Sequence, residues 1–441
     1  MQVFPLINFI NAEDAEYRRA YWECQTNFHI GNLFTFLGID TSIGFAILEK
    51  NLAKSRKYEF TNIVSESASI LGAYSKTVNI DKKKAANYDA MAYDYVMLRM
   101  AEIKGRIYLT EIYSYYAMST ATKTNVPNQI KEYLDDLEKI PLQVYSQKFI
   151  YYKKILGVMY WMSQYNYRET IRECTEAIAY FEKSAFIVIA NFRSFYFQLI
   201  PSYTYCGEFE LAKHNMEKCL LMIQKGTFNW FKAQEANIQL ALYSERYQDA
   251  YSIYQEVISD KNYNTKSIES LRQIWTLYEA YLYVFKEMGL LFIAEGEKLH
   301  VRFQAFLNKV PVLTHDKKGY NFTMYILRLF YILLKNERNA EDLYMECMEA
   351  FRKYAQRHEE TGSVSRSRYM VELLEGIARN AFKTNAVKKD KTVIAFLHRL
   401  KTEDFDITDA NLDLEPVPFP RIFDFLLGII DRVYRPSPSF R

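Results

Sequence analysis

The histidines, cysteines and carboxylates of this chain are the residues that could do chemistry, and their spacing indicates no particular reaction. His358-Glu359-Glu360-Thr361-Gly362 begins like a zinc-binding His-Glu-x-x-His helix, but Gly362 stands where the second histidine should be. A phosphate-binding loop, a nucleophile turn and a dinucleotide-binding glycine motif are all missing from the sequence. We therefore expect no catalytic residue, no metal site and no cofactor, and keep an enzyme with an unrecognised site as a distant alternative.

The cysteines and histidines are spread along the chain, so no nucleophile and base are predicted to meet. Cys347 and His358, for example, would lie on one face of a helix but about 16 Å apart. The five cysteines are odd in number and lack a Cys-x-x-Cys motif, which favours free thiols in a reducing, cytoplasmic setting. Cys174 and Cys219 are expected to pack as small hydrophobic residues.

Basic residues occur in short clusters that could contact phosphate groups. The clusters are Lys82-Lys83-Lys84, Lys317-Lys318, Arg366 with Arg368, and Lys388-Lys389 with Lys391. Abundant tyrosines could add base stacking, so nucleic-acid binding is the second hypothesis for function. The overall charge argues against nucleic-acid binding, because the chain has 56 Lys and Arg and 53 Asp and Glu, a formal net charge of only +3. We interpret the clusters as exposed links between helices.

Three stretches share one pattern, in which a small residue lies between an aromatic residue and two medium-sized residues. They read Tyr167-x-x-Thr170-x-x-x-Cys174-x-x-Ala177, Phe209-x-x-Ala212-x-x-x-Met216-x-x-Cys219 and Tyr247-x-x-Ala250-x-x-x-Tyr254-x-x-Val257. Spacings of three and four place these side chains on one helix face. Only 14 Gly and 10 Pro occur in 441 residues, which also favours helices. The sequence predicts an all-α protein.

The three patterns predict three helical hairpins. The leading helices are expected at residues 145–164, 186–206 and 230–244, and the trailing helices at 167–184, 208–225 and 247–259. Gly207 is expected to form the bend in the second hairpin. A long helix is predicted at 85–118, and Pro201 should kink or end the second leading helix.

These hairpins resemble the tetratricopeptide-repeat family over residues 144–259 and, more loosely, bacterial proteins with similarly irregular helical repeats. The resemblance implies a right-handed α-solenoid of degenerate hairpins, whose period here exceeds the ~34 residues of the regular repeat. Thr170 replaces the usual small alanine of the trailing helix. The small residue expected in each leading helix is replaced by Val158, Ile200 and Ile238.

The resemblance also implies a partner-binding groove, because the leading helices of that family line the concave face. The ten positions carried over are Tyr152, Met159, Met162, Phe197, Thr204, Tyr205, Lys232, Glu235, Gln239 and Tyr243. Their aromatic, methionine and polar side chains suit an extended or helical peptide. The basic clamp with which the family holds a terminal carboxylate is not found at these positions.

The sequence divides into four parts. Residues 1–140 form an N-terminal helical region, which either continues the repeats in divergent form or is a separate cap, and residues 141–400 hold the repeats. Residues 401–420 are acidic and proline-rich, and are expected to cross the surface in extended form. Residues 421–441 hold a last helix at 421–433, too apolar to stay in water, and a tail. That helix either caps the end of the solenoid or docks into a partner.

The sequence as a whole favours a cytoplasmic, non-enzymatic scaffold or regulatory adaptor that binds a protein or peptide partner. No membrane association is expected, because the most apolar segment, 320–334, contains Arg328 and is shorter than the ~20 residues of a membrane span. No secretory signal is seen at the start of the sequence.

Overall fold

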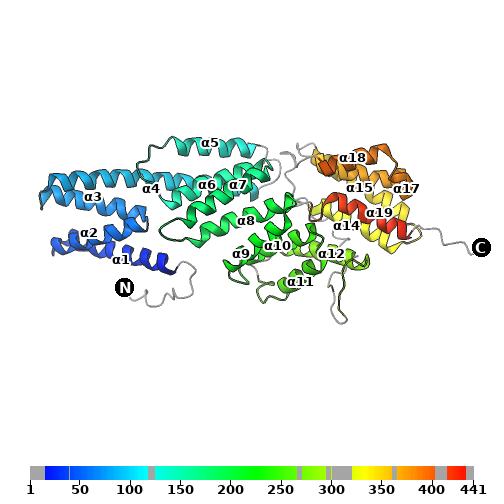
Figure 1. The fold of residues 1–441 in the computed structure, drawn as a ribbon, viewed down its shortest axis with the longest axis horizontal. Helices are drawn as coiled ribbons and strands as arrows, with labels where there is room; N and C mark the ends of the chain where they lie inside the picture. The colour runs from blue at the N-terminus through cyan, green and yellow to red at the C-terminus, as the bar shows by residue number, and fades with distance from the viewer. Residues whose placement is uncertain are drawn as a thin grey trace, which may run out of the picture. The chain divides into compact units, whose positions relative to one another are not determined.

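The computed structural model describes residues 15–38, 40–117, 125–265, 271–294, 299, 320–359, 365–402 and 415–433. Within these ranges the chain is helical and contains no strand, so the predicted all-α class is confirmed (Figure 1). The chain forms two compact units. Unit 1 comprises Met1–Ser114, Val126–Met162 and Arg168–Leu199, and unit 2 comprises Tyr115–Asn125, Ser163–Tyr167 and Ile200–Arg441. The domain boundaries expected after residues 140, 400 and 420 stay predictions.

Unit 1 is built from the first helices of the chain. These are α1 (Ala15–Leu37), α2 (Thr41–Lys57), α3 (Thr61–Thr77), α4 (Lys82–Ala117), α5 (Val126–Glu138), α6 (Gln147–Ser163), nearly all of α7 (Tyr167–Glu182) and the first part of α8 (Ile189–Tyr205). Helices α1, α2 and α3 pack on one another, and Tyr17 of α1 stacks on Phe186 with ring centroids 5.2 Å apart. Helix α4 is joined to α3 by an ion pair between Arg99 and Glu66, and to α5 by one between Lys104 and Asp136.

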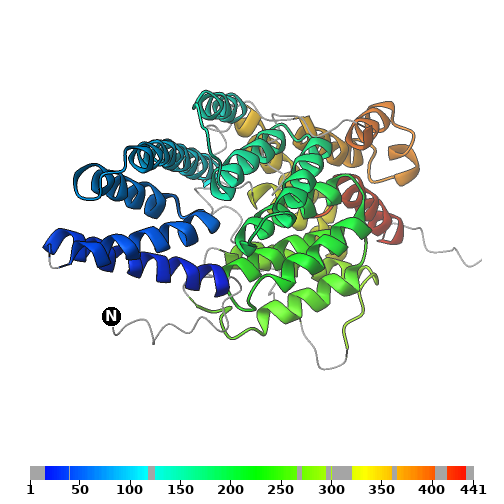
Figure 2. The same cartoon turned by 60° about the vertical axis from the view of Figure 1, so that its left-hand side comes forward.

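Unit 2 continues the helical series. Its helices are α9 (Phe209–Leu221), α10 (Phe228–Tyr243), α11 (Tyr247–Ile258), α12 (Arg272–Glu287), α14 (Tyr320–Lys335), α15 (Ala340–Glu359), α16 (Ser365–Arg379), α17 (Thr384–Val387), α18 (Lys391–Thr402) and α19 (Phe419–Val433). From α9 to α16, each labelled helix packs against the next one along the chain, and α16 packs against α18. The last helix, α19, returns to contact α14, α16, α17 and α18 (Figures 1 and 2).

Capping side chains set the start of several helices. Asp40, Asp81 and Asp390 each accept backbone N–H groups at the start of α2, α4 and α18, and Thr227 does the same for α10. Such acceptors satisfy donors that have no partner within the helix. The hydrogen bond from Ser42 lowers the pKa of Asp40, as expected for a cap that carries negative charge.

The three trailing helices α7, α9 and α11 begin at the aromatic residues of the repeated pattern, Tyr167, Phe209 and Tyr247. The six predicted hairpin helices are all present, with ends that differ from the prediction by a few residues. The small residues Thr170, Ala212 and Ala250 are fully buried, and so are Cys174 and Cys219, as expected.

The turns between the hairpin helices share one backbone feature. A residue with positive φ lies two positions before each trailing helix, namely Tyr165 (55°), Gly207 (76°) and Glu245 (59°). The predicted bend at Gly207 is confirmed. Left-handed backbone is costly for tyrosine and glutamate, so its recurrence indicates that the same turn closes all three hairpins.

Pro201 does not end its helix, because α8 continues through it to Tyr205. Proline has no N–H to donate to the carbonyl of Phe197, one turn earlier. The boundary between the two compact units falls beside it, between Leu199 and Ile200.

The C-terminal helix covers its apolar face within the chain. It begins at Phe419, and its large side chains, including Ile422, Phe423, Leu426 and Ile430, are buried. The acidic segment before it differs from the prediction at both ends: Lys401 and Thr402 belong to α18, and Glu415 is buried at 3% exposure. Residues 403–414 lie outside the described ranges. Among the described helices, none combines the length and apolar character needed to cross a membrane.

Candidate functional site

The ten predicted groove residues are divided between the two units. Tyr152, Met159, Met162 and Phe197 belong to unit 1, and the other six belong to unit 2. In unit 1, Met159 is buried and Tyr152 lies against α4 at Gly105. Met162 and Phe197 are half-buried. Met159 is therefore a packing residue, as is part of the Tyr152 side chain.

The six predicted residues of unit 2 already use much of their polar capacity within the chain. Gln239 donates to the Tyr205 hydroxyl at 2.9 Å, and Tyr243 donates to the carbonyl oxygen of Glu415 at 2.9 Å. Lys232 pairs with Glu235 at 2.6 Å, and the hydroxyl of Thr204, a buried residue, donates to its own helix. The structure thus brings Tyr205, Gln239 and Tyr243 together, but beside the chain's own C-terminal segment. The ten-residue groove stays a prediction.

Glu415 contacts three helices of unit 2, namely α10 through Tyr243, α16 and α19. Its carboxylate accepts two hydrogen bonds from the Arg366 guanidinium, at 3.1 and 2.9 Å, and one from the backbone N–H of Phe419 at 2.8 Å. Arg366 also donates to the carbonyl of Leu400 at the end of α18. The prediction that Arg366 is an exposed basic residue was therefore wrong. The pair is separated by 49 residues, which no local pattern could have indicated.

In the described part of the chain, lysines of two other basic clusters lie beside acidic side chains. Lys84 pairs with Glu49 at 3.2 Å, and Lys388 lies 3.8 Å from Asp431. Lys317 and Lys318 lie outside the described residues. Nucleic-acid binding stays a hypothesis that no observation in the structure favours.

Buried thiols account for four of the five cysteines. Cys24, Cys174, Cys219 and Cys347 are buried, and desolvation raises the pKa of Cys347 to about 12. A thiol in such an environment stays protonated and is a poor nucleophile. Among the residues that the structure describes, no three His, Cys, Asp or Glu side chains converge in a way that could hold a metal ion.

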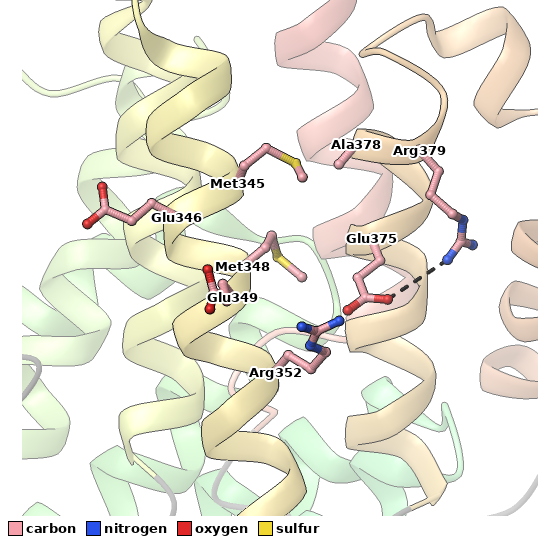
Figure 3. Close-up of a pocket in the computed structure, with 8 residues that line it drawn as sticks. All are labelled: Met345, Glu346, Met348, Glu349, Arg352, Glu375, Ala378 and Arg379. Carbon is pink, nitrogen blue, oxygen red and sulfur yellow. Dashed lines mark ion pairs between the residues drawn. The ribbon is translucent and has the colours of Figure 1, made fainter.

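An open cavity of about 440 Å³ lies between α15 and α16 (Figure 3). It is lined by Met345, Glu346, Met348, Glu349, Arg352, Glu375, Ala378 and Arg379. Met345, Met348 and Arg352 are spaced by three and four residues on the side of α15 that faces α16, whereas Figure 3 shows the Glu346 side chain directed away from α16. We call this cavity the α15/α16 groove.

The floor of the α15/α16 groove is apolar and held in place from beneath. Met348 is buried, whereas Met345 is 53% exposed, and Figure 3 shows both side chains directed toward α16. Behind them, the buried Tyr344 hydroxyl donates to the carbonyl of Leu374 at 3.1 Å and ties α15 to α16. On the other side of α16, Gly376 permits the close approach of Val393 from α18. These contacts hold α15 and α16, the two helices that line the groove, in place.

The rim of the α15/α16 groove carries more acids than bases. The lining residues include three glutamates and two arginines, and Arg379 lies 3.9 Å from Glu375. Glu349 pairs with Lys353 at 2.7 Å, which lowers the pKa of Glu349. Glu346 is exposed. An apolar floor with acidic groups beside it can accept an apolar side chain that is flanked by basic ones.

Sequence reasoning did not identify this groove as a site. In the sequence, Met345 and Met348 occupy apolar positions of a helical pattern, and the pairing of α15 with α16 is a tertiary contact. The one available signal was the interleaving of Met345 and Met348 with Glu346 and Glu349, which resembles an ordinary amphipathic helix.

Comparison with known proteins gives no match to this chain from protein-family models, curated proteins or solved structures.

Proposed function

We propose that this chain is a helical-repeat protein that binds a peptide or protein partner, and that the α15/α16 groove holds part of that partner. The observation that carries this proposal is the open methionine floor between two fixed helices, bordered by acidic side chains. In this role the chain is a non-enzymatic scaffold or adaptor. Its contact surface lies on α15 and α16, in place of the leading helices of the hairpins.

We further propose that the hairpins stack as an irregular right-handed α-solenoid, similar to tetratricopeptide repeats. The recurrent left-handed turn residue and the burial of the three small pattern residues support this arrangement. In unit 2, the packing of successive helices on one another supports it as well.

Binding would depend on an apolar anchor. Methionine side chains are flexible and polarisable, so Met345 and Met348 can adapt to a leucine-sized or phenylalanine-sized side chain. Full burial of such a side chain contributes about 1.5–3 kcal/mol. Glu349 can accept a hydrogen bond from a neighbouring Lys or Arg of the partner, which sets the direction of the peptide.

Peptide display tests the proposal. A random peptide library is selected on the full chain, and the enriched peptides are measured for affinity by fluorescence anisotropy. We expect the enriched sequences to share one large apolar residue next to Lys or Arg. Replacing the exposed Met345 with Asp should weaken their binding about tenfold, because the anchor would then lie against a charge.

A second variant tests the charge preference, and a third serves as a control. Glu349→Lys should weaken the binding of peptides in which basic residues flank the apolar anchor. The substitution should cost little stability, because the ion pair of Glu349 with Lys353 is exposed. Leu221→Asp, at an 87% exposed position at the end of α9, should leave the affinity unchanged. Enriched peptides that bind all variants equally would contradict the proposal.

A further inference from the structure

Met345, in the α15/α16 groove, is the most exposed methionine whose side chain the structure describes. It is 53% exposed, followed by Met100 of α4 at 43%, and the other methionines in the described ranges are buried or half-buried. Met348, which lies one turn later in the same groove, is 4% exposed. The sulfur of Met345 is therefore open to small molecules dissolved in water, whereas the sulfur of Met348 is shielded.

Helix α15 carries a third sulfur atom, in Cys347, which competes poorly for an oxidant. Cys347 is 2% exposed, and burial raises the pKa of its thiol to about 12. Peroxides react with the thiolate, so a buried thiol that stays protonated is protected. An oxidant that enters the α15/α16 groove should therefore react first with the thioether of Met345.

The reaction of Met345 with a peroxide is an oxygen-atom transfer. The thioether sulfur gives up two electrons and forms a bond to oxygen, while the O–O bond of hydrogen peroxide breaks and leaves water. The product is a sulfoxide, which has a side chain of similar length but carries a strongly polar S–O group. Two thiols can reverse the reaction, because they supply two electrons, become a disulfide and release the oxygen as water.

A sulfoxide at Met345 would change the floor of the α15/α16 groove. Figure 3 shows the Met345 side chain directed toward α16, with its end near Ala378, and Met348 lines the same floor. An apolar anchor bound there would remove water from the sulfoxide oxygen and would offer it no hydrogen bond. Because such burial of a polar group is unfavourable, oxidation should weaken binding.

We propose that Met345 is an oxidation site, and that its conversion to the sulfoxide by hydrogen peroxide lowers the affinity of the α15/α16 groove for its peptide. This inference rests on the proposed function, since it takes the groove to bind a peptide through an apolar anchor. It adds that binding is lost on oxidation and is restored on reduction.

Peroxide treatment of the full chain tests this proposal. The oxidised methionines are located by mass spectrometry, and the affinity for a display-selected peptide without Met or Cys is measured before and after treatment. We expect Met345 to be oxidised before Met348, and the affinity to fall about fivefold. The loss should be smaller than for Met345→Asp, because the sulfoxide has no net charge. Methionine sulfoxide reductases, with dithiothreitol as the reductant, should restore the affinity.

Two variants assign the effect to Met345. Met345→Leu has no sulfur at this position, so peroxide should leave the affinity of this variant at its own starting value. Met100→Leu removes the exposed methionine of α4 and should lose affinity on oxidation as the unaltered chain does. Because Met345 is exposed, its oxidation should not change the helical circular dichroism.

The results distinguish this inference from the proposed function. If no peptide binds the untreated chain, the proposed function fails and the inference fails with it. If peptides bind and keep their affinity once Met345 is oxidised, or lose it equally in Met345→Leu, the inference alone is overturned. A loss of helical circular dichroism that accompanies the loss of binding would also overturn it, because unfolding would then explain the result.

Discussion

Glu415 carries a buried carboxylate in the packing of unit 2. Its carboxylate is almost completely buried and is compensated by the two-pronged contact with Arg366 and by the N–H of Phe419. A charge in this environment is stable only while its partners remain, because removal from water costs several kcal/mol per ion. The same residue accepts a hydrogen bond from Tyr243 through its carbonyl.

Glu415→Gln should therefore destabilise the protein by about 3–5 kcal/mol, because Arg366 would keep a buried charge without its counterion. The measurement is urea unfolding followed by circular dichroism. Glu349→Gln, in an exposed ion pair, is the control and should cost less than about 1 kcal/mol. Equal effects of the two substitutions would show that the Arg366–Glu415 contact contributes little.

At the scale of elements, the sequence predicted the helices well because their apolar periodicity is local. The three hairpins and the long helix α4 all appear close to their expected bounds, and the turn at Gly207 follows from the backbone that only glycine adopts easily. Pro201 does not end α8, which runs through it to Tyr205, and the kink stays a prediction. A local propensity rule could not account for the packing around that helix.

Gly376 illustrates how closely two elements approach in unit 2. A Cβ atom at this position would lie 2.4 Å from Cγ2 of Val393, a buried and stiff side chain of α18. Gly376→Ala should destabilise the protein by about 1–3 kcal/mol, although alanine favours helices by about 1 kcal/mol over glycine.

A double-mutant cycle with Val393→Ala separates this clash from other effects. The combination should be more stable than the sum of the single effects predicts, because the smaller side chain removes the clash. The measurement is again urea unfolding. A more stable Gly376→Ala variant, with no coupling to Val393→Ala, would mean that α16 and α18 are not so close.

At the scale of the whole molecule, the sequence predicted the fold class but not the surfaces. Long-range pairings decide which apolar residues are covered: α19 is buried against α14, α16, α17 and α18, whereas Met345 on α15 and Ile103 on α4 remain exposed. The apolar spacing within a helix does not say which distant helix covers it, because these contacts join residues far apart in the sequence. Arg366 was predicted to be exposed for the same reason, because its partner Glu415 lies 49 residues away in the sequence.

Photo-crosslinking tests the central claim, that the α15/α16 groove holds a peptide, most directly. A display-selected peptide carries a photoreactive benzophenone side chain in place of its apolar anchor, and the crosslinked residue is located by mass spectrometry. We predict crosslinks to Met345, Met348 and Ala378, and their loss in competition with the unlabelled peptide. Crosslinks confined to Phe197, Tyr205 or Tyr243, or spread over the surface, would contradict this account.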